Sequence, residues 1–264
     1  MYFKGKRIVI IGATGGLGSA YAERFLKEGA YVFLVGRSKE KLEALCLQLS
    51  MKLPIVSADI TNEESLVHAA EKIKDWSDKI DIVINATGYD VRKSLLKHSQ
   101  KEIEQSLSVN LLGSILMTKV FLPLLKDEKG STIVHSGGFV DGRLAFPYYS
   151  ADVASRAGLF SFLESMNREL KQEKSTIRLT YFCPNAANTE AEMPFHKVWK
   201  EMGIRVSSVD EVAGVLLRGL RKQRKVIFMG RGTSLFAKLN LLSPRLADRL
   251  LLNKYGRILQ KYLR

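Results

Sequence analysis

Short apolar runs alternate with longer stretches of helical periodicity along most of the chain. The runs are rich in β-branched residues and carry few polar positions, which predicts strands that are buried on both faces. They cover residues 7–11, 31–35, 54–57, 80–84, 132–134 and 176–182. Strands of this kind are typical of parallel sheets that helices cover on both sides.

The stretches between these runs place apolar residues at helical spacing. In residues 16–27, for example, Leu17, Ala20, Tyr21 and Phe25 fall on one face. Further helices are expected over residues 39–49, 63–76, 102–125 and 151–170. Right-handed crossovers between parallel strands then predict an α/β protein with a doubly wound parallel sheet of the Rossmann type. We expect a single domain over residues 1–230, followed by an extension over residues 231–264.

Composition narrows the class of protein further. The 264 residues are 46% hydrophobic, which is ample for a core and excludes a disordered chain. The two cysteines, Cys46 and Cys183, are far apart and show no metal-ligand spacing, which fits a reducing compartment. The N-terminus leads directly into the first strand without the apolar segment of a signal peptide, and no run reaches the roughly 18 apolar residues of a spanning helix. These features predict a cytoplasmic protein.

The positive charge is concentrated at one end of the chain. The net charge is +14, and residues 213–264 hold 13 Lys and Arg against one acid, Asp248, a net +12. The other residues carry 41 − 13 = 28 bases and 27 − 1 = 26 acids, a net +2. The main body is therefore nearly neutral, and we expect no nucleic-acid partner.

A glycine-rich turn joins the first predicted strand to the first predicted helix. It reads Gly12-Ala13-Thr14-Gly15-Gly16-Leu17-Gly18. Glycines at such a turn permit a tight bend, a close approach of backbone to a pyrophosphate and contact between helix and strand, while the amides of the helix N-terminus bind phosphate. A turn without a ligand is the alternative, but the position inside a strand–helix–strand unit favours dinucleotide binding.

This GxxxGxG spacing resembles that of the short-chain dehydrogenase/reductase family, and the resemblance extends over about residues 5–230. Asp59 matches an aspartate that contacts adenine, and residues 85–88 (Asn-Ala-Thr-Gly) resemble the family's NNAG segment. Pro184 and Thr189 match the ends of the PGxVxT segment, which closes over the nicotinamide, although Asn185 replaces its glycine. The resemblance implies an oxidoreductase whose cofactor is held by Gly12, Thr14, Gly15, Gly16, Leu17, Gly18, Arg37, Ser38, Asp59, Ile60, Asn85, Ala86, Thr87, Gly88, Arg156, Pro184 and Thr189.

The residues after the second predicted strand favour NADP over NAD. NAD-preferring dinucleotide folds place an acid there to bind the ribose 2′-hydroxyl. This chain instead has Arg37 and Ser38, and a guanidinium can pair with a 2′-phosphate. A solvated arginine at the start of a helix is the alternative.

The catalytic segment departs from the family pattern. The family uses a tyrosine as proton donor, a lysine four residues later that lowers its pKa, a serine that orients the substrate oxygen, and a helix asparagine. Asn110 matches the asparagine, Ser136 is the serine near the end of the fifth predicted strand, and Tyr149 follows it by 13 positions. However, the residue four positions after Tyr149 is Val153, not lysine.

Two interpretations remain open at this point. In the first, the helix entrance carries three extra residues and Tyr149 works with Arg156. In the second, Asp152 and Arg156 occupy the tyrosine and lysine positions, since residues 154–159 resemble the family's ASKAAL segment. Asp152 and Arg156 would then form a surface-type ion pair, and the protein would bind NADP without ordinary reductase chemistry. Tyr149 is the provisional proton donor.

Other chemistries find little support in the sequence. The four histidines show no HExxH or paired spacing, so we expect no metal site. No GxSxG nucleophile elbow and no GKS or GKT phosphate loop is present.

Two segments near the C-terminus concern the substrate and the partners. Residues 190–203 occupy the family's substrate lid, and their bulky apolar side chains suit a hydrophobic or acyl-type substrate, although plain helix packing explains them equally well. In residues 231–264, two apolar faces flank Pro244 and basic residues accompany them. This extension can contact an anionic membrane, dock on a partner subunit in a homo-oligomer, or steer an acidic acyl carrier.

The sequence thus predicts an NADP-dependent short-chain dehydrogenase/reductase that interconverts a carbonyl and an alcohol on a hydrophobic or acyl-type substrate. The alternative is a catalytically impaired NADP-binding protein that serves as a membrane- or partner-binding module, in the cytoplasm or peripherally on a membrane.

Overall fold

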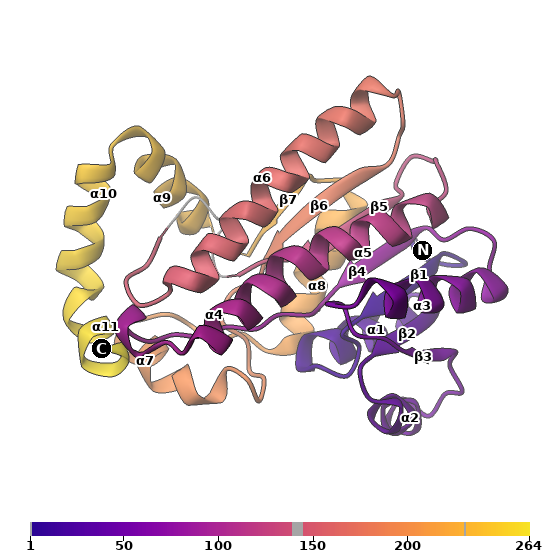
Figure 1. Ribbon diagram of the computed structural model, residues 1–264, viewed down its shortest axis with the longest axis horizontal. Coiled ribbons are helices and arrows are strands. Elements are labelled where there is room, and N and C mark those ends of the chain that lie inside the picture. Colours follow the sequence, from indigo (N-terminus) through magenta and orange to yellow (C-terminus); the bar gives the residue numbers. More distant parts are fainter. Residues whose placement is uncertain (1, 139–144, 230) are drawn as a thin grey trace.

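A computed structural model describes residues 2–138, 145–229 and 231–264 (Figure 1). Seven parallel strands form one sheet in the order β3-β2-β1-β4-β5-β6-β7. The strands are β1 (Arg7–Ile11), β2 (Tyr31–Gly36), β3 (Ile55–Ser57), β4 (Ile82–Asn85), β5 (Thr132–Ser136), β6 (Arg178–Cys183) and β7 (Val226–Phe228). The order reverses between β1 and β4, and at such a crevice doubly wound folds bind their ligands. The predicted fold class is confirmed.

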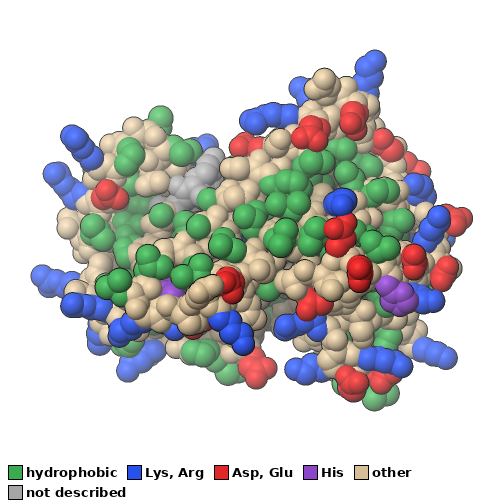
Figure 2. Space-filling view, in the orientation of Figure 1, with side chains coloured by type: hydrophobic (Ala, Val, Ile, Leu, Met, Phe, Trp, Pro, Cys, Tyr) green, Lys and Arg blue, Asp and Glu red, His purple; other side chains and the backbone are tan. Residues whose placement is uncertain are grey.

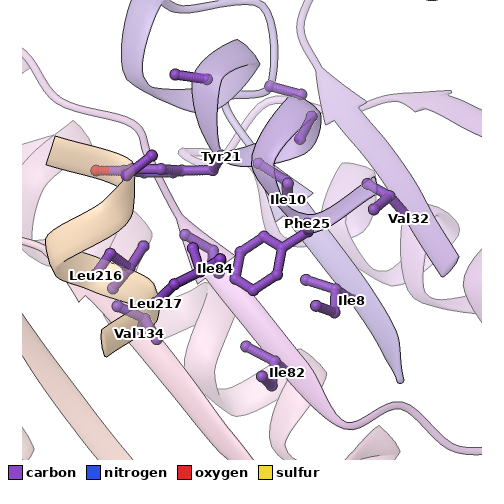
Figure 3. Close-up of a cluster of buried hydrophobic side chains, with 14 of the residues drawn as sticks. Ile8, Ile10, Tyr21, Phe25, Val32, Ile82, Ile84, Val134, Leu216 and Leu217 are labelled. Carbon is purple, nitrogen blue, oxygen red and sulfur yellow. The ribbon is translucent and has the colours of Figure 1, made fainter. Parts of the chain in front are cut away.

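Helices cover both faces of the sheet. One face carries α1 (Gly16–Lys27), α2 (Lys39–Gln48) and α8 (Val209–Arg221). The other carries α3 (Glu63–Trp76), α5 (Gly113–Phe121) and α6 (Ser150–Gln172). Figure 3 shows the first layer, where Tyr21 and Phe25 of α1 lie beside Leu216 and Leu217 of α8 over the strands.

The strand pattern explains why the apolar runs are continuous. In β1, Ile8 and Ile10 belong to the core under α1, whereas Val9 and Ile11 belong to the core under α3 and α5. Alternate side chains of a strand point to opposite faces, so a sheet buried on both sides requires apolar residues at every position.

The elements differ from the sequence prediction in three respects. The helix α8, which covers one face of the sheet, was not predicted. The last strand, β7, was not predicted, because three residues (Val226–Phe228) give too short a pattern to recognise. The predicted helix over 102–125 is composite: α4 (Gln100–Leu107) continues through the wider π-helical turn η2 (Ser108–Leu112) into α5, and a short 3₁₀ turn, η3 (Leu122–Leu124), ends it. Residues 100–124 are long and apolar enough to cross a membrane by length and composition, and one third of their most apolar window is buried inside the protein.

The C-terminal extension is entirely helical. It consists of α9 (Arg231–Leu242), α10 (Pro244–Leu251), the π-helical turn η5 (Leu252–Gly256) and α11 (Arg257–Leu263). In Figure 1, α9 and α10 project from the body, whereas α11 returns to it beside α7 (His196–Glu201). The apolar residues of α11 bury themselves against α7 of the predicted substrate lid, so the extension completes this part of the fold.

Candidate active site

Glycines shape the turn that leads into α1. Gly12 has a φ of +79°, and a Cβ there would lie 2.9 Å from Thr87 Cγ2. A Cβ on Gly18 would lie 2.2 Å from the carbonyl oxygen of Gly12, so only glycine lets the first turn of the helix approach the strand. A Cβ on Gly16 would lie 2.7 Å from Thr189 Cγ2. The turn and the segment after β6 are therefore in contact, as the predicted cofactor site requires.

The N-terminus of α1 is open toward a cavity. Gly15 is the N-cap, no side chain caps the helix, and Thr14, Gly15, Gly16 and Leu17 line the cavity. The unpaired amides of a helix N-terminus attract anions. This end of the cavity could therefore hold a pyrophosphate.

The end of β2 holds a mixture of charges. Arg37 is exposed there, and Ser38 caps α2 by accepting a hydrogen bond from the amide of Lys41 (3.2 Å). The Ser38 hydroxyl also donates to Glu40 Oε2 (2.7 Å), so a carboxylate lies close to the expected phosphate position. The sequence analysis missed Glu40, because it lies beyond the position at which NAD-preferring folds usually place their acid.

Asp59 and Asn85 stabilise the loops around the cofactor site. Asp59 Oδ1 accepts hydrogen bonds from the amide (2.8 Å) and hydroxyl (2.7 Å) of Thr61. Burial opposes the charge on Asp59, but these bonds outweigh it and hold its pKa below the usual value. Asn85 is buried: its Nδ2 donates to Ser114 Oγ (3.0 Å) and its Oδ1 accepts from Thr87. Of the NATG segment, Ala86 and Gly88 line the cavity.

Five charged side chains meet at the opposite end of the cavity. Arg156 of α6 contacts Asp152 Oδ1 with Nε (3.2 Å), Asp90 Oδ1 with Nη2 (3.0 Å) and the carbonyl of Ser136 with Nη1 (3.1 Å). Arg92 contacts Asp90 Oδ2 (3.0 Å) and both carboxylate oxygens of Glu192, and its guanidinium lies 4.3 Å from the ring centroid of Phe195. Trp199 of α7 donates to Glu192 Oε2 (2.8 Å), which attaches the lid to this cluster.

The start of α6 carries the residues of both alignments of the catalytic segment. Asp152 and Arg156 lie one turn apart near the start of α6 and both line the cavity, in the arrangement that the family gives its tyrosine and lysine. The expected surface-type ion pair is wrong, because only 10% of the Asp152 side chain and 5% of the Arg156 side chain are exposed. The helix begins only at Ser150, which places Tyr149 before its first turn.

Asn110 holds this cluster from behind. It is buried in η2, and its Nδ2 lies within hydrogen-bonding distance of Asp152 Oδ1 (3.3 Å), Ser155 Oγ (3.1 Å) and the carbonyl of Tyr89 (2.9 Å). Its Oδ1 accepts from the amide of Tyr89 (2.9 Å). Asn110 therefore positions Asp152 and the loop that carries Asp90.

Tyr149 lines the cavity as part of an apolar wall. Its ring lies near Phe146 and 5.6 Å from the guanidinium of Arg92. Its hydroxyl is buried and has no hydrogen-bond partner among the described residues. Burial raises the pKa of the phenol above its ordinary value.

Among the predicted catalytic residues, Ser136 is the one whose side chain lies away from the cavity and from the charged cluster. Its hydroxyl is directed toward Tyr21 of α1, on the opposite side of the sheet from His135, and Ser136 is absent from the lining of the cavity. Gly138 lies beside the acid cluster instead. A Cβ there would lie 3.7 Å from Asp152 Oδ2 and 3.6 Å from Arg156 Nε. Among the described residues, the position of this strand end that lies closest to Asp152 therefore has no side chain.

One cavity of about 370 Å³ joins the glycine-rich turn to the acid cluster. Phe146, Val153, Ala186 and Trp199 contribute apolar walls. Pro184, Asn185 and Thr189 line it between the two ends. Within the ranges that the structure describes, no group of three or more potential metal ligands is present.

The charges in the cluster shift the pKa values of its carboxyl groups apart. Burial and the nearby carboxylate of Asp90 raise the pKa of Asp152 to about 7, against the attraction of Arg156. Burial also opposes the charge on Asp90, but Arg156 and Arg92 outweigh it and hold the pKa of Asp90 well below its usual range. A protonated carboxyl beside an ionised one is the arrangement of an acid/base pair.

Comparison with known proteins identifies the family. The family model described as short chain dehydrogenase matches residues 6–198. The chain belongs to the short-chain dehydrogenase/reductase family. By its relatives it is a dehydrogenase/reductase of that family.

The relatives and neighbours span most of the fold. Dehydrogenase/reductase SDR family protein 7-like of Anopheles gambiae is 31% identical over 196 residues, 71% of this chain and 61% of that protein. SDR family member 7B of Xenopus laevis is 27% identical over 263 residues, 93% and 80% of the two chains. Two solved structures align well: a short chain dehydrogenase of Burkholderia cenocepacia in complex with NADP (25% identity, TM-score 0.80, 96% and 99% coverage) and one of Burkholderia phymatum in complex with NAD (19%, 0.82, 93% and 96%).

Sequence reasoning missed three members of the charged cluster: Asp90, Arg92 and Glu192. Asp90 and Arg92 follow the NATG segment at alternate positions, and this was a usable signal because the loop after β4 borders the cofactor site in the Rossmann arrangement. Glu192 gave no signal, since its partners are more than 90 residues away in the sequence or on the lid.

Proposed function

We propose that this protein transfers hydride between NADP(H) and a carbonyl or alcohol group of a hydrophobic or acyl-type substrate. The observation that carries the proposal is the cavity that connects the helix N-terminus of the glycine-rich turn with a buried cluster of carboxyl and guanidinium groups. A nicotinamide placed between them supplies hydride chemistry. The chain contributes an anion site at one end, a proton-exchanging group at the other and apolar walls between.

The preference for NADP is supported by Arg37. Its exposed guanidinium at the end of β2 can pair with a 2′-phosphate, as the bidentate geometry of arginine allows. The carboxylate of Glu40 would repel the same phosphate, so NADP binding requires that the attraction of Arg37 exceed this repulsion. The Burkholderia cenocepacia relative was solved in complex with NADP.

The preference for an apolar substrate rests on the lid side of the cavity. Both arginines there are already paired with carboxylates, which leaves no cation free in the described cluster for an anionic substrate. Aromatic and aliphatic side chains supply the other contacts. Burial of an apolar substrate group against them contributes about 25 cal/mol per Å².

The test is a titration with NADPH and NADH, followed by turnover of ketones, aldehydes and 3-oxoacyl thioesters. Trp199 lines the cavity, whereas Trp76 packs against Phe33 on the far side of the sheet, so Trp199→Phe shows which tryptophan reports binding. We expect both nucleotides to quench the fluorescence of Trp199 and NADPH to bind more tightly than NADH. If the protein binds neither NADPH nor NADH, the proposal is wrong.

A second role is favoured by the leucines of the C-terminal extension. Six of them are at least 43% exposed: Leu235, Leu241, Leu242, Leu246, Leu250 and Leu252. Exposed basic residues accompany them, at Lys238, Arg245, Arg249, Lys254 and Arg257. Figure 2 shows lysine and arginine side chains along the edge formed by α10. We propose that this surface contacts an anionic lipid bilayer, because each base near such a surface contributes about 1 kcal/mol and the leucines add apolar burial.

This role is tested by sedimentation with anionic and with neutral vesicles. Truncation before α9 is a poor variant, because it also removes α11 from the lid. Leu242→Glu changes the most exposed of these leucines (85%) without touching the core. We expect salt-sensitive binding to anionic vesicles that Leu242→Glu weakens. Failure to sediment at low salt, or a concentration-dependent dimer that the same variant abolishes, contradicts a lipid partner.

A further inference from the structure

We propose that Asp152 is the catalytic acid/base: its carboxyl group gives the proton to the substrate oxygen during carbonyl reduction and takes it during alcohol oxidation. The inference rests on the proposed function and names the group that replaces a phenol in this chain. It is carried by where Asp152 lies, by how it is held and by the charges around it.

The carboxyl group is fixed by one of its oxygens. Both Asn110 Nδ2 (3.3 Å) and Arg156 Nε (3.2 Å) lie within hydrogen-bonding distance of Oδ1. Oδ2 lies beside Gly138, and the missing side chain of that glycine leaves space next to it within the cavity lining. A carboxyl held at one oxygen can present the other to a substrate in a constant direction, which proton transfer requires.

Among the described residues of the cluster, the carboxyl groups outnumber the guanidinium groups by one. Three carboxyl groups (Asp90, Asp152 and Glu192) face two guanidinium groups (Arg92 and Arg156). Arginine stays protonated in proteins, so the two cations balance two carboxylates. Asp90 has contacts to both guanidinium groups and Glu192 has two to Arg92, whereas Asp152 shares only Arg156. Asp152 is therefore the carboxyl that retains the proton near neutral pH.

Tyr149 is less suited to the same task. Its hydroxyl has no partner among the described residues. Arg92, whose guanidinium lies 5.6 Å from the ring centroid, is already paired with Asp90 and Glu192. A phenol donates readily when a neighbouring group stabilises the phenolate, and no described group hydrogen-bonds this oxygen. The geometry assigns Tyr149 to the wall of the cavity.

The proton balance is simple. As a hydride from NADPH forms the new C–H bond, the O–H bond of the Asp152 carboxyl breaks and its proton forms the O–H bond of the alcohol. The resulting carboxylate is stabilised by Arg156. It regains a proton from solvent through the cavity, which Asp152 lines. Oxidation of an alcohol reverses each step.

The pH dependence follows from the groups around Asp152. Carbonyl reduction requires the protonated carboxyl, so kcat for reduction falls as pH rises through about 7. Alcohol oxidation requires the carboxylate, so kcat for oxidation rises over the same range. A phenol with a raised pKa stays protonated there and gives no such change. Among the described residues, the titratable and charged groups that interact with Asp152 are Asp90, Arg92, Tyr149, Arg156 and Tyr181.

The experiment compares Asp152→Asn with Tyr149→Phe in the full chain. Asparagine keeps the volume and an oxygen acceptor for Asn110 and Arg156 but cannot donate an acidic proton. We expect kcat for NADPH-dependent reduction to fall about 10²–10⁴-fold in Asp152→Asn, the usual contribution of a general acid. Tyr149→Phe should keep a kcat within about tenfold of wild type, and both variants should bind NADPH much as wild type does.

A second readout needs no turnover. Infrared spectra of the protein with NADPH bound should contain a protonated-carboxyl C=O band that disappears as pH rises through about 7, is absent in Asp152→Asn and persists in Tyr149→Phe. An active wild type with an equally active Asp152→Asn, or the absence of this band below pH 7, overturns the role of Asp152 and leaves the proposed function standing. A wild type that neither binds NADPH nor reduces any carbonyl compound overturns the proposed function itself.

Discussion

The docking of α11 on α7 gives a quantitative prediction for Leu259→Ala. Leu259 is completely buried, in a cluster with Trp199 and Met202 of the lid region. Truncation of a buried leucine removes its transfer free energy and leaves a cavity, at a total cost of about 2–5 kcal/mol. Because α11 lies at the edge of the fold and its surroundings can relax, we expect the lower end, about 2 kcal/mol.

Leu259→Ala should affect substrate binding in the cavity as well as the stability of the fold. Trp199 is both a cavity wall and a neighbour of Leu259, so a loosened α11 should raise KM for an apolar substrate more than the Kd for NADPH. Urea unfolding and steady-state kinetics measure the two effects. Leu252→Ala is the matched control, since that leucine is 51% exposed and should change the free energy of unfolding by less than about 0.5 kcal/mol. Equal stabilities of the two variants would refute the docking of α11.

Four further predictions address the other parts of the structure. Gly16→Ala should raise the Kd for NADPH at least about tenfold, about 1.4 kcal/mol, because the new methyl group meets Thr189 Cγ2 at 2.7 Å. Titration calorimetry measures this Kd, and an unchanged value contradicts the contact between the turn and Thr189. Arg37→Asp should weaken NADPH binding by about 1.5–3 kcal/mol and leave NADH binding nearly unchanged; equal losses for both would remove Arg37 from the phosphate site. Asp152→Asn should gain stability relative to wild type as pH rises from 5 to 8. Folding raises the pKa of the Asp152 carboxyl from 3.8 to about 7, so this group stabilises the wild-type fold at low pH, and the contribution is lost as pH rises through about 7. Parallel plots of the free energy of unfolding against pH, measured in urea, would exclude a raised pKa. Leu112→Glu, at an exposed leucine of η2, should lower the mass measured by light scattering if a homo-oligomer forms through that face, and an unchanged mass argues against this face.

Much of the fold was predictable from local patterns. β1, α1 and α3 begin and end at the predicted residues, because continuous apolar runs and helical periodicity identify elements buried on both sides of a sheet. The glycine turn was predictable for the same reason, since its geometry depends on neighbours in the sequence. β7 was not, because three residues carry too little pattern.

The acid cluster was harder to predict, because it depends on long-range contacts. Asp90 meets Arg156 across 66 positions and Arg92 meets Glu192 across 100. The sequence could pair Asp152 with Arg156 at helical spacing, but it could not tell that both are buried. Ser136 was chosen by residue type, whereas the alternation of side chains along β5 turns its hydroxyl away from the cavity. The roles of Ser136, Asn110 and Tyr149 stay predictions that mutation can test.

The most direct measurement follows a hydrogen atom from cofactor to substrate. NADPH deuterated at the nicotinamide C4 position is incubated with the protein and an apolar ketone or 3-oxoacyl thioester, and the alcohol is analysed by mass spectrometry. The account predicts deuterium on the carbinol carbon, faster from NADPH than from NADH, and strongly reduced transfer in Asp152→Asn. Cofactor that binds in the cavity but transfers no deuterium to any substrate of this class would contradict it.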